Sequence, residues 1–129
     1  MSRRLAIAAC LGAFALPASA PAGPMPDQPS RLLVTAREYS LTLSRPKLPA
    51  GRSIVQLHNF GEDPHDLHLQ RKGANRVYEV GEVAPGETAA LDLKLRRRST
   101  YRLWCSIEPH ASLGMVTALK TRAKRPRAR

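Results

Sequence analysis

The sequence predicts an all-β fold, a sandwich or barrel of short strands. Three observations support this prediction: apolar residues recur with a period of two, turn signals separate the runs about every 8 to 12 residues, and no window has the spacing of an amphipathic helix. Such folds gather their loops at the two ends. A site at one end could therefore be assembled from residues that lie far apart in the sequence.

The expected strands follow this alternation along the chain. A first strand begins within residues 32–35, residues 77–80 form a short strand or irregular segment, and residues 115–119 form the last strand. Between them, five segments each direct a set of side chains to one face. These sets are Leu41 and Leu43; Val55 and Leu57; His65, Leu67 and Leu69; Leu91, Leu93 and Leu95; and Tyr101, Leu103 and Cys105. Turns and loops are predicted at 46–51, 60–64, 71–75, 84–87 and 96–99.

The N-terminal segment has the composition of a secretory signal peptide. Arg3 and Arg4 precede an apolar run at residues 5–16, and residues 18–20 form a small-x-small cleavage signature. The sequence therefore predicts a signal peptide at residues 1–20 and export to the periplasm or the extracellular side of the cell envelope. The two arginines match a twin-arginine signal only in part, so the export route stays open.

The rest of the chain divides into three parts. Residues 21–30 are rich in proline and predict a linker, residues 31–119 carry the strand pattern of one domain, and residues 120–129 form a basic tail predicted to be disordered. The formal net charge is +11, and the tail contributes much of it. A solvated chain end is the simpler interpretation of the tail, and attraction to an anionic surface is the functional one. Export argues against nucleic acid as a partner, and we expect a monomer.

Cysteine usage narrows the chemistry. The chain has two cysteines, and cleavage after residue 20 would remove Cys10. The remaining Cys105 could then form no disulfide within the exported chain. Its thiol must be buried, paired with another molecule, catalytic or bound to a metal.

A group of potential metal ligands surrounds this cysteine. His110 and Met115 follow Cys105 at equal spacing on one predicted loop, and His65 begins an inward-facing strand after another. A thiolate, two imidazoles and a weak axial thioether suit copper. The alternatives are a buried core thiol for Cys105 and a core-filling side chain for Met115. The other two histidines, His58 and His68, are interpreted as surface residues, with a secondary metal role for His68 as a minor alternative.

These residues resemble the copper-binding pattern of the cupredoxins, the type 1 blue-copper proteins. The resemblance is carried by Asn59-Phe60-Gly61, by Pro64-His65-Asp66 and by Cys105-x4-His110-x4-Met115, and it covers residues 31–119. Within the family, the spacing from cysteine to methionine is most similar to that of rusticyanins and auracyanins. The resemblance implies a Greek-key sandwich, one copper ion cycling between Cu(I) and Cu(II), and one-electron transfer.

Two positions depart from the family pattern. Asp66 stands where many cupredoxins have asparagine, and the resemblance implies that this side chain braces the cysteine loop, at an amide near Ser106. A carboxylate there should favour Cu(II) and lower the reduction potential. Glu108 and Pro109 replace a common Pro-Gly pair before His110, which places a charge near the expected electron exit. Asn59 is expected to form a turn that supports the site.

Several functions use the same residues. The leading hypothesis is an electron carrier that serves a redox protein of the cell envelope. A second is a copper sequestration or delivery protein without a redox partner. A copper enzyme is disfavoured because it needs an open coordination position or a second metal. A metal-free interaction module is disfavoured because all four ligand types are present.

Overall fold

The computed structural model describes residues 28–123, and its regular structure there is entirely β-strand. The strands are β1 (Ser30–Arg37), β2 (Ser40–Leu43), β3 (Lys47–Pro49), β4 (Gly51–Asn59), β5 (His65–Arg71), β6 (Val77–Val83), β7 (Thr88–Leu95), β8 (Thr100–Trp104) and β9 (Val116–Arg122). The all-β prediction is therefore confirmed. In the described part of the chain, no helix has the length and apolar character needed to cross a membrane.

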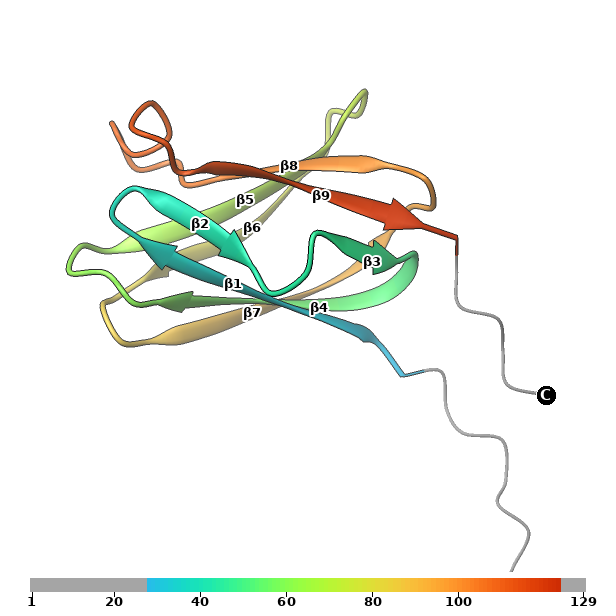
Figure 1. Ribbon diagram of the computed structural model, residues 1–129, viewed down its shortest axis with the longest axis horizontal. Coiled ribbons are helices and arrows are strands. Elements are labelled where there is room, and N and C mark those ends of the chain that lie inside the picture. Colours follow the sequence, from blue (N-terminus) through green and yellow to red (C-terminus); the bar gives the residue numbers. More distant parts are fainter. Residues whose placement is uncertain (1–27, 124–129) are drawn as a thin grey trace, which may run out of the picture.

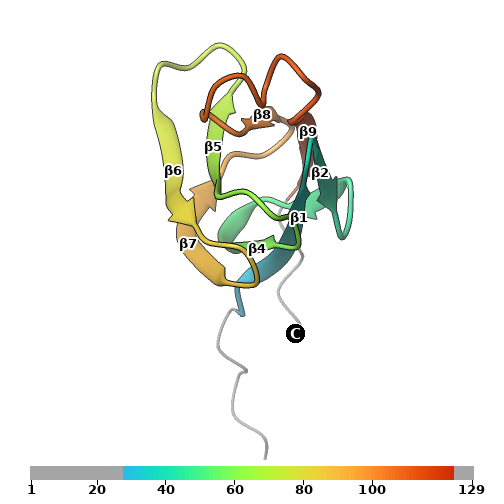
Figure 2. The same ribbon diagram turned by 90° about the vertical axis from the view of Figure 1, so that its left-hand side faces the viewer.

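The strands form two mixed sheets that pack face to face (Figures 1 and 2). One sheet has the order β2-β1-β4-β7 and the other β3-β9-β8-β5-β6. Most neighbours are antiparallel, but β1 pairs with β4 and β3 pairs with β9 in parallel. The connections β1–β2, β4–β5, β6–β7 and β8–β9 gather at one end of the sandwich, on the left in Figure 1.

The core lies between the sheets and follows the predicted alternation. Buried side chains come from alternate positions of β1, β4, β5, β7 and β8, which places one face of each sheet inward. Burying a leucine or valine stabilises the fold by about 1.5–3 kcal/mol. The largest completely buried apolar side chains include Leu32, Leu57, Leu67, Leu69, Tyr101, Leu103 and Leu119.

Two predicted boundaries differ from the structure. The segment predicted as a turn at 46–51 contains the short strand β3, and β9 continues through Arg122 into the predicted basic tail. The two differences have one cause, because β3 pairs with the end of β9. Leu48 and Thr121 are buried there. Pro49 lacks an amide hydrogen, which suits β3 to the edge of its sheet.

The remaining parts of the domain prediction lie largely outside the described residues. The signal peptide at 1–20, most of the linker and residues 124–129 of the tail belong to this part of the chain. The linker was predicted to end at residue 30, and β1 begins at Ser30.

Thr121 holds the extended end of β9 in place, so its replacement by valine should destabilise the protein. Its hydroxyl donates to the carbonyl of Arg96 at 2.5 Å and accepts from the amide of Ser99 at 2.9 Å. Valine keeps the shape and leaves both backbone groups unpaired. We expect the free energy of unfolding to fall by about 1–2 kcal/mol, measured by chemical denaturation. Thr117→Val, on the same strand outside this network, is the control and should change stability less.

Candidate metal centre

The predicted ligands come from two neighbouring strands and the loop beyond one of them. His65 is the first residue of β5, and Cys105 directly follows β8. His110 lies in the loop that leads to β9. Because β5 and β8 pair side by side, with His68 opposite Trp104, the start of β5 and the end of β8 lie at the same end of the sandwich.

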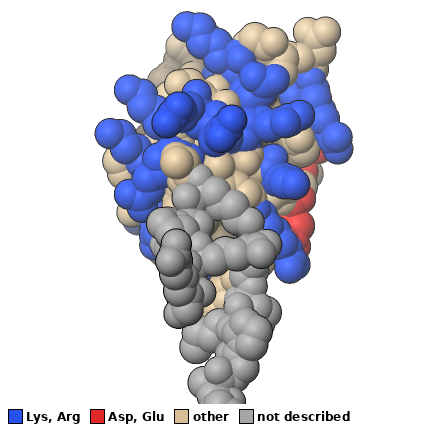
Figure 3. Space-filling view, turned by 90° about the vertical axis from the view of Figure 1, so that its right-hand side faces the viewer, with Lys and Arg blue, Asp and Glu red and all other residues tan. Residues whose placement is uncertain are grey.

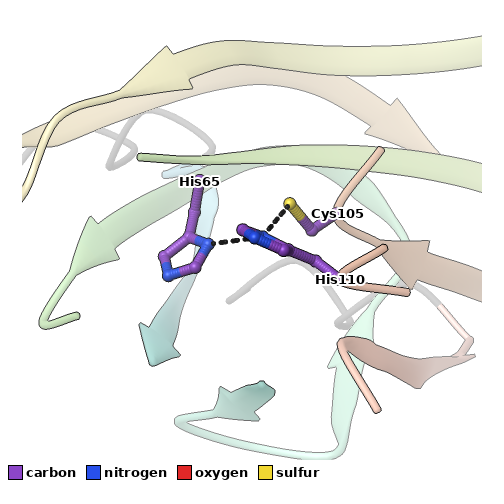
Figure 4. Close-up of side chains that lie close together, drawn as sticks. All are labelled: His65, Cys105 and His110. Atoms are coloured by element: carbon purple, nitrogen blue, oxygen red, sulfur yellow. Dashed lines mark hydrogen bonds between the residues drawn. The ribbon is translucent and has the colours of Figure 1, made fainter. Parts of the chain in front are cut away.

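At that end His65, Cys105 and His110 converge (Figure 4). Their donor atoms all lie within 4.8 Å of one another. The Nδ1 atoms of the two histidines are 3.2 Å apart, and Nδ1 of His110 lies 3.6 Å from the Cys105 sulfur. The exposed fraction is 0% for His65 and Cys105 and 6% for His110. The structure therefore brings together three of the four predicted ligands in a buried cluster.

The spacing of these donors fits a single first-row metal ion. Zinc sites place nitrogen about 2.0 Å and sulfur about 2.3 Å from the metal, so donors around one ion in a trigonal plane lie about 3.5 to 3.7 Å apart. The two distances in the cluster are within a few tenths of an ångström of these values. One thiol with two imidazoles is the donor set of a His₂Cys trigonal copper site.

Met115, the fourth predicted ligand, is completely buried beside the cluster. Its backbone carbonyl accepts from the amide of Cys105 at 3.1 Å, and its amide donates to the carbonyl of His110 at 3.0 Å. These bonds close the loop on itself and tie both loop ligands to the start of β9. Axial coordination by the Met115 thioether remains a prediction.

Asp66 braces the cysteine loop, as the resemblance implied. The amide of Ser106 donates to Oδ1 of Asp66 at 2.6 Å, and the Ser106 hydroxyl donates to Oδ2. His68 contacts the same Oδ2 at 3.2 Å. Burial of the carboxyl opposes its ionisation, but the two bonds from Ser106 prevail, and the pKa of Asp66 is lowered. The carboxylate is therefore charged while it holds the residue next to Cys105.

Asp66→Asn should raise the reduction potential of a copper-loaded site. The asparagine oxygen can still accept the Ser106 amide, while the negative charge that favours Cu(II) is lost. We expect a shift on the order of one tenfold change in the Cu(II)/Cu(I) equilibrium, about 59 mV for one electron. Redox titration of the visible band measures it, and a fall or no change would contradict the prediction.

Asn59 supports the loop that precedes His65. Its side-chain amide donates to the carbonyls of Asp63 and Val83 at 2.8 and 2.9 Å, and its oxygen accepts from the amide of Gly61 at 2.8 Å. The residue is completely buried. The predicted supporting turn is therefore present, and it joins the β4–β5 loop to the end of β6.

Glu38, which was not predicted from the sequence, contacts His65 from the β1–β2 connection. Oε1 of Glu38 lies 2.9 Å from Nε2 of His65 and also accepts the amides of Glu62 and Asp63, at 2.9 Å each. The amide of Asp63 is the main cause that lowers the pKa of Glu38 to about 2, against the opposing effect of desolvation. A charged carboxylate at Nε2 fixes the proton there and turns the Nδ1 lone pair of His65 into the cluster.

Two glycines and Tyr39 complete the contact between this connection and the site. The ring of Tyr39 packs edge-on against His110, with centroids 5.3 Å apart. A side chain at Gly61 would collide with Glu38, and a Cβ at Gly114 would lie 2.9 Å from the Tyr39 carbonyl. Both glycines therefore permit the approach of the β1–β2 connection. A glutamate in a polar turn carries no local signal of such a role.

The other histidines lie outside the cluster. His58 is half-buried and contacts the Thr88 hydroxyl at 2.5 Å. His68 lies over Trp104, with ring centroids 5.4 Å apart. Both histidines were predicted to be surface residues, and both are half-buried.

Copper uptake should become tighter as pH rises above 7. Burial raises the pKa of the Cys105 thiol, so the metal-free protein carries the proton and binding through the thiolate must release it. Because one proton leaves, the apparent Cu(I) affinity should rise about tenfold per pH unit below that pKa. Competition with a chromophoric chelator between about pH 7 and 8.5 measures the slope. A constant affinity would show that Cys105 is already a thiolate.

The sequence and the structure of the chain were compared with those of known proteins. No protein-family model and no curated protein sequence matches the chain. Solved structures match it well. Auracyanin from Roseiflexus castenholzii, in its dithionite-reduced form, shares 14% identity over 71% of this chain and 96% of its own, with a TM-score of 0.60.

Two further solved structures resemble the fold of this chain to a similar degree. Auracyanin A, a "blue" copper protein from Chloroflexus aurantiacus, shares 15% identity over 73% of this chain and 99% of its own, with a TM-score of 0.59. A blue copper oxidase from Nitrosomonas europaea shares 15% identity over 77% of this chain but only 40% of its own, with a TM-score of 0.55. The chain thus has the fold of the cupredoxins, and its His-Cys-His group is compatible with a single type 1 copper site.

Proposed function

We propose that this protein is an exported electron carrier with one type 1 copper ion, held by His65, Cys105 and His110 with Met115 as a weak axial ligand. The observation that carries the proposal is the convergence of one thiol and two Nδ1 atoms in a buried cluster. Copper bound there would supply a one-electron couple between Cu(I) and Cu(II).

The surrounding residues suit such a couple because they hold the ligands independently of the metal. Glu38 orients His65, Asp66 holds the cysteine loop, and the Met115 backbone bonds to both loop ligands. Ligands that are fixed from outside move little when the charge of the centre changes. The burial of the three donors would also limit the access of water to the metal. Both effects favour rapid electron transfer over substrate binding.

His110 is the ligand through which electrons would leave. It is the only member of the cluster with a measurable exposed fraction, and it lies against Tyr39, which is 40% exposed. Leu113, in the same loop, is 52% exposed. A redox protein of the cell envelope could bring its own centre close to this edge. The same layout suits a monomer that presents one end to its partner.

The deciding experiment is a spectrum of the purified chain after addition of one equivalent of Cu(II). We expect an intense visible thiolate-to-copper band, the narrow paramagnetic-resonance splitting of a type 1 site, and rapid electron self-exchange. A chain that takes up no copper, or takes it up without the visible band, would refute the proposal.

Copper delivery is the alternative that uses the same ligands. It predicts ready transfer of Cu(I) to an acceptor chelator and slow self-exchange. The complete burial of His65 and Cys105 favours the electron carrier, because a delivery site must release its ion. An enzyme would need an open coordination position, and the proposed axial ligand Met115 would fill it.

Export from the cytoplasm is part of the proposal. It is supported by the signal-like composition of residues 1–20. N-terminal sequencing of the exported protein should begin at Pro21. A protein that keeps its first residues in the cell envelope would contradict cleavage at this position.

A further inference from the structure

Charge is segregated along the long axis of the molecule. The loops and strand ends around the candidate metal centre carry the exposed acids Glu38, Glu62, Asp63, Glu82, Glu87 and Glu108. Arg37 is the only lysine or arginine in the connections 37–40, 59–65, 82–88 and 105–116. The end of the sandwich that bears the metal centre is therefore negative.

The opposite end is strongly basic. We define the basic end by six exposed cations: Lys47, Arg96, Arg97, Arg98, Lys120 and Arg122. Lys47 of β3 lies opposite Lys120 of β9 in the sheet. The amide of Ser99, next to the three arginines, donates to the hydroxyl of Thr121, which lies between Lys120 and Arg122. Figure 3, which faces this end, shows many lysines and arginines spread over the part of the surface that is not drawn in grey. No acidic residue occurs in the segments 45–51, 93–100 and 119–123.

The two ends of the described chain leave the fold at this basic end. β1 starts there at Ser30 and β9 ends there at Arg122 (Figure 1). Residues 124–129, which lie outside the described part of the chain, follow soon after β9 in the sequence and contain four further lysines or arginines. The cations come from three separate turns and strand ends, and they spread over the end of the sandwich. This layout suits a broad anionic surface better than one small ligand.

We propose that the basic end binds the surface of an anionic lipid bilayer and orients the metal centre away from it. Each lysine or arginine near such a surface contributes roughly a fivefold increase in partitioning. The acidic end is repelled by the same surface, so the charge layout defines one orientation. The inference goes beyond the proposed function and does not depend on copper, so metal-free protein tests it equally well.

The experiment is cosedimentation of the purified chain with vesicles at low ionic strength. Vesicles with about a third of phosphatidylglycerol in phosphatidylcholine should bind the protein, and binding should fall steeply as salt rises because exposed charges are screened. Phosphatidylcholine vesicles should not bind it. Equal binding to both would assign the affinity to apolar residues and overturn the proposal. Absence of binding to the anionic vesicles would also overturn it, whatever the protein does with heparin or an acidic protein.

Matched variants locate the surface. Replacing Arg96, Arg97 and Arg98 together by glutamine should weaken binding about a hundredfold, and Arg97→Gln alone about fivefold. Arg37→Gln, the same substitution at the acidic end, should change it less than twofold. Circular dichroism shows whether each variant is folded. Equal effects of Arg37→Gln and Arg97→Gln would contradict a localised surface.

The single tryptophan reports the orientation. Trp104 is half-buried at the end of β8 next to Cys105, at the metal end of its strand. With the basic end on the bilayer, lipids that carry a spin label in the headgroup should leave its fluorescence nearly unchanged. Strong quenching would show that the metal end faces the membrane and would overturn the orientation.

Discussion

Cys105→Ala should abolish the visible copper band and the type 1 resonance signal. The thiolate is the soft donor of the cluster, and its sulfur lies 3.6 Å from Nδ1 of His110. Without it, two imidazoles remain, which is a donor set for an ordinary Cu(II) complex with weak colour. We expect at least a hundredfold loss of Cu(I) affinity, since soft sulfur ligands select that ion. Absorption and chelator competition on wild type and variant measure both effects.

A histidine outside the cluster gives the matched control. His68→Ala removes an imidazole that contacts Asp66 but is not part of the donor cluster, and it should retain the band. Thermal unfolding of the metal-free proteins separates a damaged site from a damaged fold. A Cys105→Ala variant that keeps the intense band would refute the assignment of the thiolate.

Glu38→Gln should weaken Cu(II) binding by about 10- to 100-fold, the range for outer-shell partners of metal ligands. The carboxylate oxygen lies 2.9 Å from Nε2 of the completely buried His65. A glutamine oxygen can still accept this hydrogen bond and the two loop amides, so the substitution removes mainly the charge. Loss of that charge makes His65 a weaker donor and favours Cu(I), so the potential should rise. Chelator competition and redox titration measure the two changes.

Glu62→Gln is the control for this substitution. Glu62 lies on the adjacent loop, is exposed, and donates its amide to Glu38. This substitution also removes one negative charge, but the Glu62 side chain does not contact His65. It should therefore change the Cu(II) affinity and the potential much less. Nitrogen NMR of the metal-free protein adds a readout independent of copper, because His65 should carry its proton on Nε2. A proton on Nδ1, or equal effects of the two variants, would contradict the role of Glu38.

The three potential ligands on the loop before β9 could be predicted from the sequence because they lie within a few residues of one another. Cys105, His110 and Met115 share one loop, whose backbone bonds connect all three. His65 could be added because the alternation with Leu67 directs it inward after a turn. The role of Asp66 could be predicted because it directly follows His65 and because the family resemblance implies a bracing side chain at that position. Each of these inferences needed only the period of a strand and the chemistry of nearby side chains.

Glu38 could not be found in this way because its role depends on which segments pack together. It reaches His65, 27 positions later, only because the β1–β2 connection lies over the β4–β5 loop. The parallel pairing of β3 with β9 was missed for the same reason, and with it the true end of the last strand.

The order of residues is enough to predict that this chain forms strands, which of their faces are apolar, and that a thiol, imidazoles and a thioether occur in an order that suits copper. That Glu38 orients His65, and that acids and bases separate to opposite ends of the molecule, follows from the packing of distant segments. A period of two specifies the face of each side chain, whereas packing specifies its neighbours. Acidic and basic residues that are scattered along the sequence therefore gather at opposite ends of the molecule only when the chain folds and brings the connections at each end together.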